Sequence, residues 1–71
     1  MSEPTARERI RALVDALPKP EQYVISRIFF GGASLAQVGQ ECGHDKWWAR
    51  TTRNRGLQRL RALLKRVSEA A

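Results

Sequence analysis

The segment from residue 34 to residue 61, SLAQVGQECGHDKWWARTTRNRGLQRLR, decides the fold because it carries two helix starts on either side of a glycine. Ser34 and Gln37 have the capping-box spacing, in which each side chain bonds the backbone N–H of the other residue. Gly43 ends the helix that begins after Ser34, since glycine adopts a positive φ at little cost. Asp45 is a favourable N-cap for a second helix. The segment therefore predicts a short helix, a turn at Gly43 and a long helix.

Small residues recur in this segment at fixed positions. With Leu35 as the first position, Gly39 is the fifth, Gly43 the ninth and Ala49 the fifteenth. A small fifth residue allows the second helix to cross closely, the ninth lies in the turn, and the fifteenth points into the seam between the helices. This spacing is that of a helix–turn–helix, whose second helix enters the major groove of DNA. Gly56, farther along, is expected to contact the body of the domain.

Two more helices are expected before residue 34. Thr5 and Glu8 form another capping box, followed at helical spacing by Ile10, Leu13, Val14 and Leu17. Pro18 and Pro20 end that helix. A second helix is expected over 21–30, ended by Gly31 and Gly32, with an apolar stripe of Val24, Ile25, Ile28 and Phe29 and with Tyr23 at its edge.

The predicted architecture is one all-α domain of four helices over residues 1–71, with the helix–turn–helix at about 34–61 and the last helix ending near Val67. A chain of 71 residues can bury one modest core. Residues 1–44 contain five basic and five acidic residues, whereas residues 45–71 contain eight basic and two acidic residues, so the whole net charge of +6 lies in the last third. Such a one-sided positive field attracts polyanions.

Several function classes are excluded by what the sequence lacks. The single cysteine, Cys42, excludes an internal disulfide and is expected to be buried in the seam, and His44 is expected to be a turn residue without a role. No catalytic triad, carboxylate pair or phosphate-binding loop is recognisable, so we expect no enzyme, no cofactor and no metal. No signal-peptide core follows Met1 and no apolar run reaches the ~20 residues of a spanning helix, which predicts a cytoplasmic protein without a membrane partner.

A set of short motifs runs from about Ile10 to Leu64: Ala16-Leu17-Pro18, Glu21-Gln22, Val24, Phe30-Gly31, Ser34-Leu35, Val38-Gly39, Gly43 and Leu57-Gln58-Arg59-Leu60-Arg61. In combination they resemble region 4 of bacterial RNA polymerase sigma factors. The resemblance implies a four-helix domain that reads the −35 promoter element in double-stranded DNA and docks on the flap of the polymerase β subunit. An anti-sigma factor is a further implied partner, and in isolation a monomer is expected because the four packed helices should leave no apolar face.

The resemblance also implies site residues. The DNA-facing positions are Lys46, Trp47, Arg50 and Thr51, with Arg53 and Arg55 one turn farther along. Arg50 is the candidate for base readout and Lys46 for a phosphate contact, since arginine can bond guanine bidentately and both neutralise phosphate. The flap-docking surface is expected at Tyr23, Phe30, Leu60 and Leu64.

The sequence departs from the sigma pattern at the seam and at the start of the recognition helix. Ala49 and Thr52 stand where the family usually carries larger aliphatic residues, and Trp47 and Trp48 stand where it usually carries polar ones; Gln37 replaces a common acidic residue. We expect Trp48 to fold over the volume missing at the seam. Three interpretations of Trp47 stay open: contact with a thymine methyl or a sugar, an anchor for a protein partner, or a core residue.

Other functions also fit the pattern. The output domain of LuxR-type regulators shares the four-helix plan, although the long basic stretch after Arg55 favours the sigma interpretation. The tryptophan pair favours a small regulator, for example one encoded by a phage, that binds polymerase or a sigma factor through this fold without reading DNA. A basic amphipathic helix on an anionic membrane is disfavoured by Gly56 and by the many capping signals.

Overall fold

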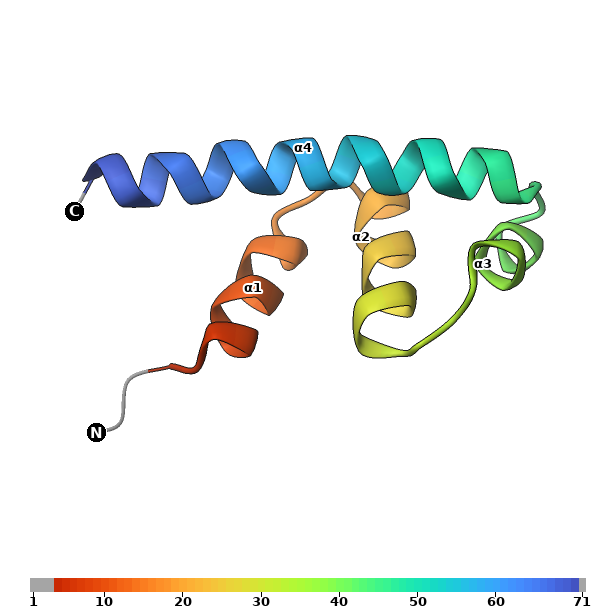
Figure 1. Ribbon diagram of the computed structural model, residues 1–71, viewed down its shortest axis with the longest axis horizontal. Helices are drawn as coiled ribbons and strands as arrows, with labels where there is room; N and C mark the ends of the chain where they lie inside the picture. Colours follow the sequence, from red (N-terminus) through yellow and green to blue (C-terminus); the bar gives the residue numbers. More distant parts are fainter. Residues whose placement is uncertain (1–3, 71) are drawn as a thin grey trace.

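The computed structural model describes the backbone of residues 4–70 and the side chains of residues 4–66. Within this part of the chain there are four α-helices and no strand: α1 (Ala6–Asp15), α2 (Lys19–Ile25), α3 (Leu35–Glu41) and α4 (Lys46–Ala70) (Figure 1). A π-helical turn, η1 (Ser26–Phe30), continues α2. The predicted all-α architecture with four helices is confirmed, although α4 continues to Ala70 rather than ending near Val67.

The long helix α4 forms one side of the molecule, and the other helices lie along it (Figure 1). Its 25 residues span nearly the full 40 Å length of the molecule, as expected at about 1.5 Å per residue. In chain order, α1 lies near its C-terminal half, α2 near its middle and α3 near its N-terminal end. The start of α4 is therefore the part that α3 supports.

The side chains form two small cores along α4. One contains Val14, Leu17, Ile25 and Leu60 and joins α1 and α2 to the second half of α4. The other contains Val24, Val38 and Ala49 and joins α2 and α3 to its first half. Cys42, expected to be buried in the seam, is half-buried and packs against this second core, and burial raises the pKa of its thiol.

The predicted helix starts are confirmed in atomic detail. Both bonds of the first capping box are present, between Thr5 and Glu8. Both bonds of the second are present between Ser34 and Gln37, at 3.0 and 3.1 Å. The Oδ1 atom of Asp45 accepts a hydrogen bond of 2.9 Å from the backbone N–H of Trp48 and so caps α4.

The second predicted helix differs from expectation at its end. Over 26–30 the backbone forms a π turn, with the N–H of Gly31 donating to the carbonyl of Ser26, five residues back, at 3.1 Å. In a π turn, residues five apart become neighbours. Phe30, five residues after Ile25, therefore packs against the first core, while Phe29 is 58% exposed. The predicted place of Phe29 in the buried stripe is wrong for this reason.

Arg59 of α4 is part of the framework that joins α2 to α4. Glu21 is buried where α2 crosses α4, and the Nε atom of Arg59 lies 3.0 Å from its Oε2 and 3.2 Å from its Oε1, with hydrogen-bond geometry only to Oε1. A Cβ at Gly56 would come within 3.3 Å of the Cβ of Glu21 and 2.3 Å of the Cδ1 of Ile25. The predicted contact of Gly56 with the body of the domain is thus confirmed, and Arg59 is an ion-pair partner there.

Candidate nucleic-acid interface

The bend between α3 and α4 is built by the residues that the spacing singled out. A Cβ at Gly39 would lie 2.3 Å from the backbone oxygen of Asp45, so only glycine permits this approach of the two helices. Gly43 has a φ of +74°, the left-handed conformation that glycine adopts without strain. The N–H of His44 donates to the carbonyl of Gly39 at 2.8 Å, and Ala49 is completely buried. The short helix, the turn at Gly43 and the long helix predicted for this segment are present.

Trp48 lies at the seam between α3 and α4, where it was expected to fold. Trp48 is half-buried and packs against the second core, next to Ala49 and Thr52. Its ring stacks on that of His44, with centroids 4.2 Å apart and an angle of 12° between the planes. His44 was expected to have no role, but its stacking on Trp48 makes it part of the packing between α3 and α4.

The first two turns of α4 present one outward face. Lys46, Trp47, Arg50 and Thr51 are all exposed, and the structure brings these four predicted DNA-facing residues together. Trp47 is 59% exposed, which excludes the interpretation of this side chain as a core residue. We call these four residues the basic face.

The other two predicted DNA-facing residues lie apart from the basic face. Arg53 and Arg55 are two positions apart, which places them on roughly opposite sides of the helix, since each residue turns it by about 100°. Arg53 is half-buried and its guanidinium donates to the Oδ1 of Asn54 at 3.2 Å, whereas Arg55 is exposed. These residues therefore flank the basic face on its two sides.

Asn54, which was not among the predicted site residues, is exposed and follows Arg50 by four residues. Trp47, Arg50, Thr51 and Asn54 have the i, i+3, i+4, i+7 spacing of one helix face. An asparagine amide can bond the major-groove edge of adenine bidentately. Helical spacing from Trp47 was the signal that could have identified it.

The positive charge of the basic face does not stabilise α4. The N-terminus of a helix carries a partial positive charge, so cations there cost about 0.3–1 kcal/mol each. Even so, the first turn of α4 contains Lys46 and no acidic residue. Among the side chains of residues 4–66, Arg59 is the sole cation of α4 with a carboxylate partner. The charge of the basic face is therefore available to an external anion.

The helix α3 is held against α2 and η1 by a hydrogen-bonded cluster around Glu41. The guanidinium of Arg27 donates to both carboxylate oxygens of Glu41, at 3.0 and 2.7 Å, and the hydroxyl of Tyr23 donates to Oε1 at 2.8 Å. The bonds from Arg27, and then that from Tyr23, lower the pKa of Glu41 from 4.5 to about 2. The same bond raises the pKa of the Tyr23 hydroxyl.

This cluster predicts a loss of stability in acid. The unfolded carboxyl of Glu41 takes up a proton near pH 4.5 and the folded one near pH 2, so its contribution is complete above pH 4.5 and is lost as the pH falls toward 2. In urea titrations across this range, the stability advantage of the wild-type chain over Glu41→Gln should shrink as the pH falls. An advantage that stays constant down to pH 2 would contradict the assignment.

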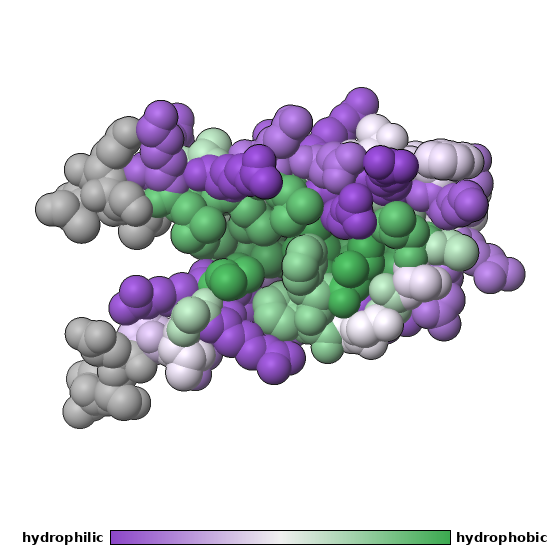
Figure 2. Space-filling view, viewed as in Figure 1, coloured by the Kyte–Doolittle hydropathy of each residue, from purple (hydrophilic) through white to green (hydrophobic). Residues whose placement is uncertain are grey.

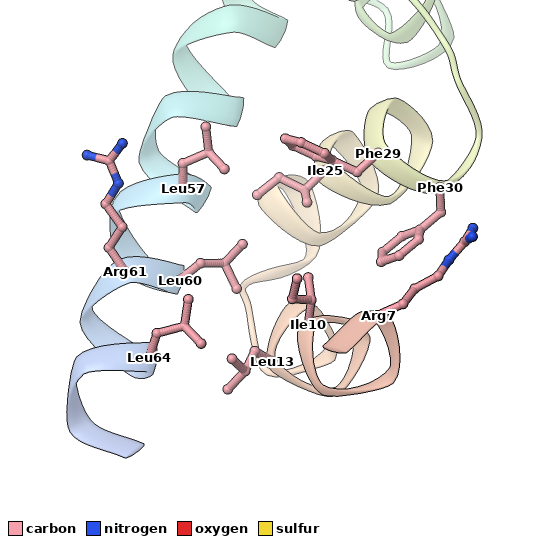
Figure 3. A pocket seen from close by; sticks show the side chains of 10 residues that line it. All are labelled: Arg7, Ile10, Leu13, Ile25, Phe29, Phe30, Leu57, Leu60, Arg61 and Leu64. Atoms are coloured by element: carbon pink, nitrogen blue, oxygen red, sulfur yellow. The ribbon is translucent and has the colours of Figure 1, made fainter. Parts of the chain in front are cut away.

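A second candidate surface is an apolar groove between α1, η1 and α4. It has a volume of about 520 Å³ and is lined by Ile10, Leu13, Ile25, Phe29, Phe30, Leu57, Leu60 and Leu64 (Figure 3). Arg7 and Arg61 border it on opposite sides, and the guanidinium groups of Arg7 and Arg11 lie 5.4 and 5.1 Å from the ring centroid of Phe30. On this face of the molecule the apolar side chains form a band between polar edges (Figure 2).

The groove contains three of the four residues predicted for partner docking. Phe30, Leu60 and Leu64 line it, whereas Tyr23 lies outside it and bonds Glu41. The expectation that helix packing leaves no apolar face is wrong, because Ile10, Phe29 and Leu64 are 42%, 58% and 46% exposed. The reason is that α1 slants away from α4 toward its N-terminus and η1 turns Phe29 outward.

Comparison with protein-family models, with curated proteins and with solved structures found no match to this chain. Within the described residues, no three His, Cys, Asp or Glu side chains gather closely enough to hold a metal ion. None of the described helices carries an apolar stretch long enough to cross a bilayer.

Proposed function

We propose that the chain is a sequence-specific DNA-binding module of transcription, similar to sigma factor region 4, which inserts the start of α4 into the major groove. The observation that carries the proposal is the basic face: exposed cations without carboxylate partners, at the positive end of a helix that a helix–turn–helix joint holds in place. The free backbone N–H groups at the start of α4 and the cationic side chains together form an anion-binding site. Duplex DNA is the polyanion whose groove admits a helix of this width.

The residues of the basic face and those beside it are suited to different kinds of contact. Arg50, in the second turn, is the candidate for bidentate readout of guanine, and Asn54, one turn farther, for readout of adenine. Lys46 at the leading end and the flanking Arg53 and Arg55 are suited to phosphates, which position the helix without specifying sequence. A cationic helix that bound any polyanion would not need base-reading side chains placed between phosphate-binding ones.

The test is a selection from a random-sequence duplex library with the whole chain, followed by salt titration of binding to the selected 30-base-pair duplex. For four to six neutralised phosphates, the slope of log affinity against log salt should be about −4 to −5. Affinity should then fall by about 100- to 2,000-fold between 50 and 200 mM salt. A chain that selects no sequence and shows no salt dependence is not a DNA-binding module of this kind.

A second function, docking on RNA polymerase, is favoured by the apolar groove. A groove of about 520 Å³ that leaves Phe29 and Leu64 exposed is of the size that binds an inserted side-chain cluster. The flap of the polymerase β subunit is the partner that the sigma resemblance implies. A regulator that binds polymerase without reading DNA would use the same groove, and a LuxR-type output domain would share the basic face.

The groove predicts the effect of an added charge. Leu64→Asp should abolish capture of core RNA polymerase in a pull-down, because it places a carboxylate in an apolar site at a cost of several kcal/mol. Ala62→Asp is the matched control, since it adds the same charge to an exposed position of α4 that does not line the groove. Both variants should bind DNA alike. Equal capture of core RNA polymerase by the two variants would show that the groove is not the polymerase-binding site.

A further inference from the structure

Trp47 is the feature of the basic face that neither phosphate contacts nor packing explains. Its ring is 59% exposed, in the first turn of α4, and takes no part in either core. The Nζ of Lys46 lies 5.3 Å from the ring centroid and the Cζ of Arg50 lies 5.9 Å from it. The two cations proposed to contact DNA thus lie near an apolar ring that is itself largely exposed.

The two cations associate with the ring because no acidic side chain competes for them. Asp45, the nearest carboxylate in sequence, accepts the N–H of Trp48 as the helix cap. Neither Lys46 nor Arg50 forms an ion pair among the described side chains. Cations over an aromatic face are attracted by the ring quadrupole, which makes the face of the neutral ring electron-rich. The ring therefore holds both cations on the side of α4 that faces outward.

The major groove offers one apolar group to such a ring. The edges of guanine, adenine and cytosine present only donors and acceptors there, whereas thymine adds a 5-methyl group. An indole pressed on a polar edge would strip water without replacing its hydrogen bonds. Three residues of helix rise about 4.5 Å, close to the ~3.4 Å between base pairs, so Trp47 and Arg50 are spaced to meet neighbouring base pairs.

Building on the proposed DNA-binding function, we propose that Trp47 is a specificity-determining residue that recognises thymine through its 5-methyl group, beside the base pair contacted by Arg50. The ring has two tasks in this arrangement. Its apolar surface covers the methyl group, and its negative face holds the Arg50 guanidinium on the adjacent base pair.

The test removes the methyl group instead of the base. The duplex selected from a random library is synthesised with every thymine replaced by uracil, then with single replacements. Wild-type affinity should fall about fourfold at one position, which corresponds to the ~0.8 kcal/mol of one buried methyl group. Trp47→Gln should bind both duplexes equally, and Trp47→Phe, which keeps an apolar ring, should retain the preference for thymine.

Two further outcomes overturn the inference and are distinguishable from each other. If the wild-type chain binds the selected duplex but does not distinguish thymine from uracil, Trp47 does not read the methyl group although the DNA-binding function holds. If the chain binds no duplex and Trp47→Gln abolishes capture of core RNA polymerase, Trp47 is a protein anchor and the DNA-binding function fails with it. The salt slope should be the same for Trp47→Gln and wild type, because the ring neutralises no phosphate.

Discussion

Gly39→Ala is expected to lower the free energy of unfolding by about 2–3 kcal/mol, a large part of the roughly 4–10 kcal/mol available to a domain of this size. In an open helix the same substitution would stabilise by about 1 kcal/mol. Here the new Cβ would lie 2.3 Å from the backbone oxygen of Asp45, and a backbone atom can move only if α3 and α4 separate. Urea denaturation followed by circular dichroism measures the effect.

A matched control is Gly56→Ala on α4. Its Cβ would also meet an atom at 2.3 Å, but that atom is the Cδ1 at the end of the Ile25 side chain, which can rotate. We expect a smaller loss of stability, and little loss of DNA affinity in conditions where the variant is folded. If Gly39→Ala is as stable as wild type, the close approach of α3 and α4 at Gly39 is wrong.

The elements set by local chemistry were predictable from the sequence. The caps at Thr5, Ser34 and Asp45 depend on side chains within three residues of the backbone groups they bond, and all three are present. The roles of Gly39 and Gly43 followed from their spacing, because a close crossing and a positive φ each favour glycine.

The groove was only partly predictable, because it depends on how whole helices pack. A regular helix places Phe29 beside Ile25, and nothing local to 26–30 distinguishes that helix from the π turn that turns Phe29 outward. The separation of Tyr23 from Phe30 and Leu64 likewise depends on Glu41, eighteen residues after Tyr23 in the chain. The contacts that decide these positions lie far apart in sequence.

The basic face, too, was predictable where it depends on one helix and not where it depends on packing between helices. Helical spacing grouped Lys46, Trp47 and Arg50 correctly, since their positions depend on one helix alone. Whether Trp47 is buried depends on the neighbouring helices, and the sequence left that open. The state of Arg59 likewise depends on another helix, because its ion pair with Glu21 of α2 removes it from the set of free cations.

Reversing the charges of Lys46 and Arg50 is expected to reduce affinity for the selected duplex by about 100- to 1,000-fold, since it removes one base contact and one phosphate contact and adds repulsion. The control is the double variant Lys65→Glu with Arg66→Glu, which changes the net charge equally near the far end of α4. Nineteen residues separate Lys46 from Lys65, about 28 Å along the helix. This is well beyond the Debye length of about 8 Å at physiological salt, so a loss under about tenfold is expected there.

The stability of the variant changed at Lys46 and Arg50 should stay the same or rise although its DNA affinity falls. Weaker binding can then be assigned to lost contacts, because the variant is still folded. The change Lys46→Glu places a carboxylate at the positive end of the helix and should stabilise it by a few tenths of a kcal/mol to about 1 kcal/mol. Arg50→Glu, one turn farther along, should add little, whereas glutamates in place of Lys65 and Arg66 lie nearer the negative end. The variant changed at Lys46 and Arg50 should therefore unfold at the same or higher urea concentration than wild type while binding DNA far more weakly. Equal loss of affinity in the two double variants would instead assign binding to the overall charge of α4, and the basic face would have no special part in it.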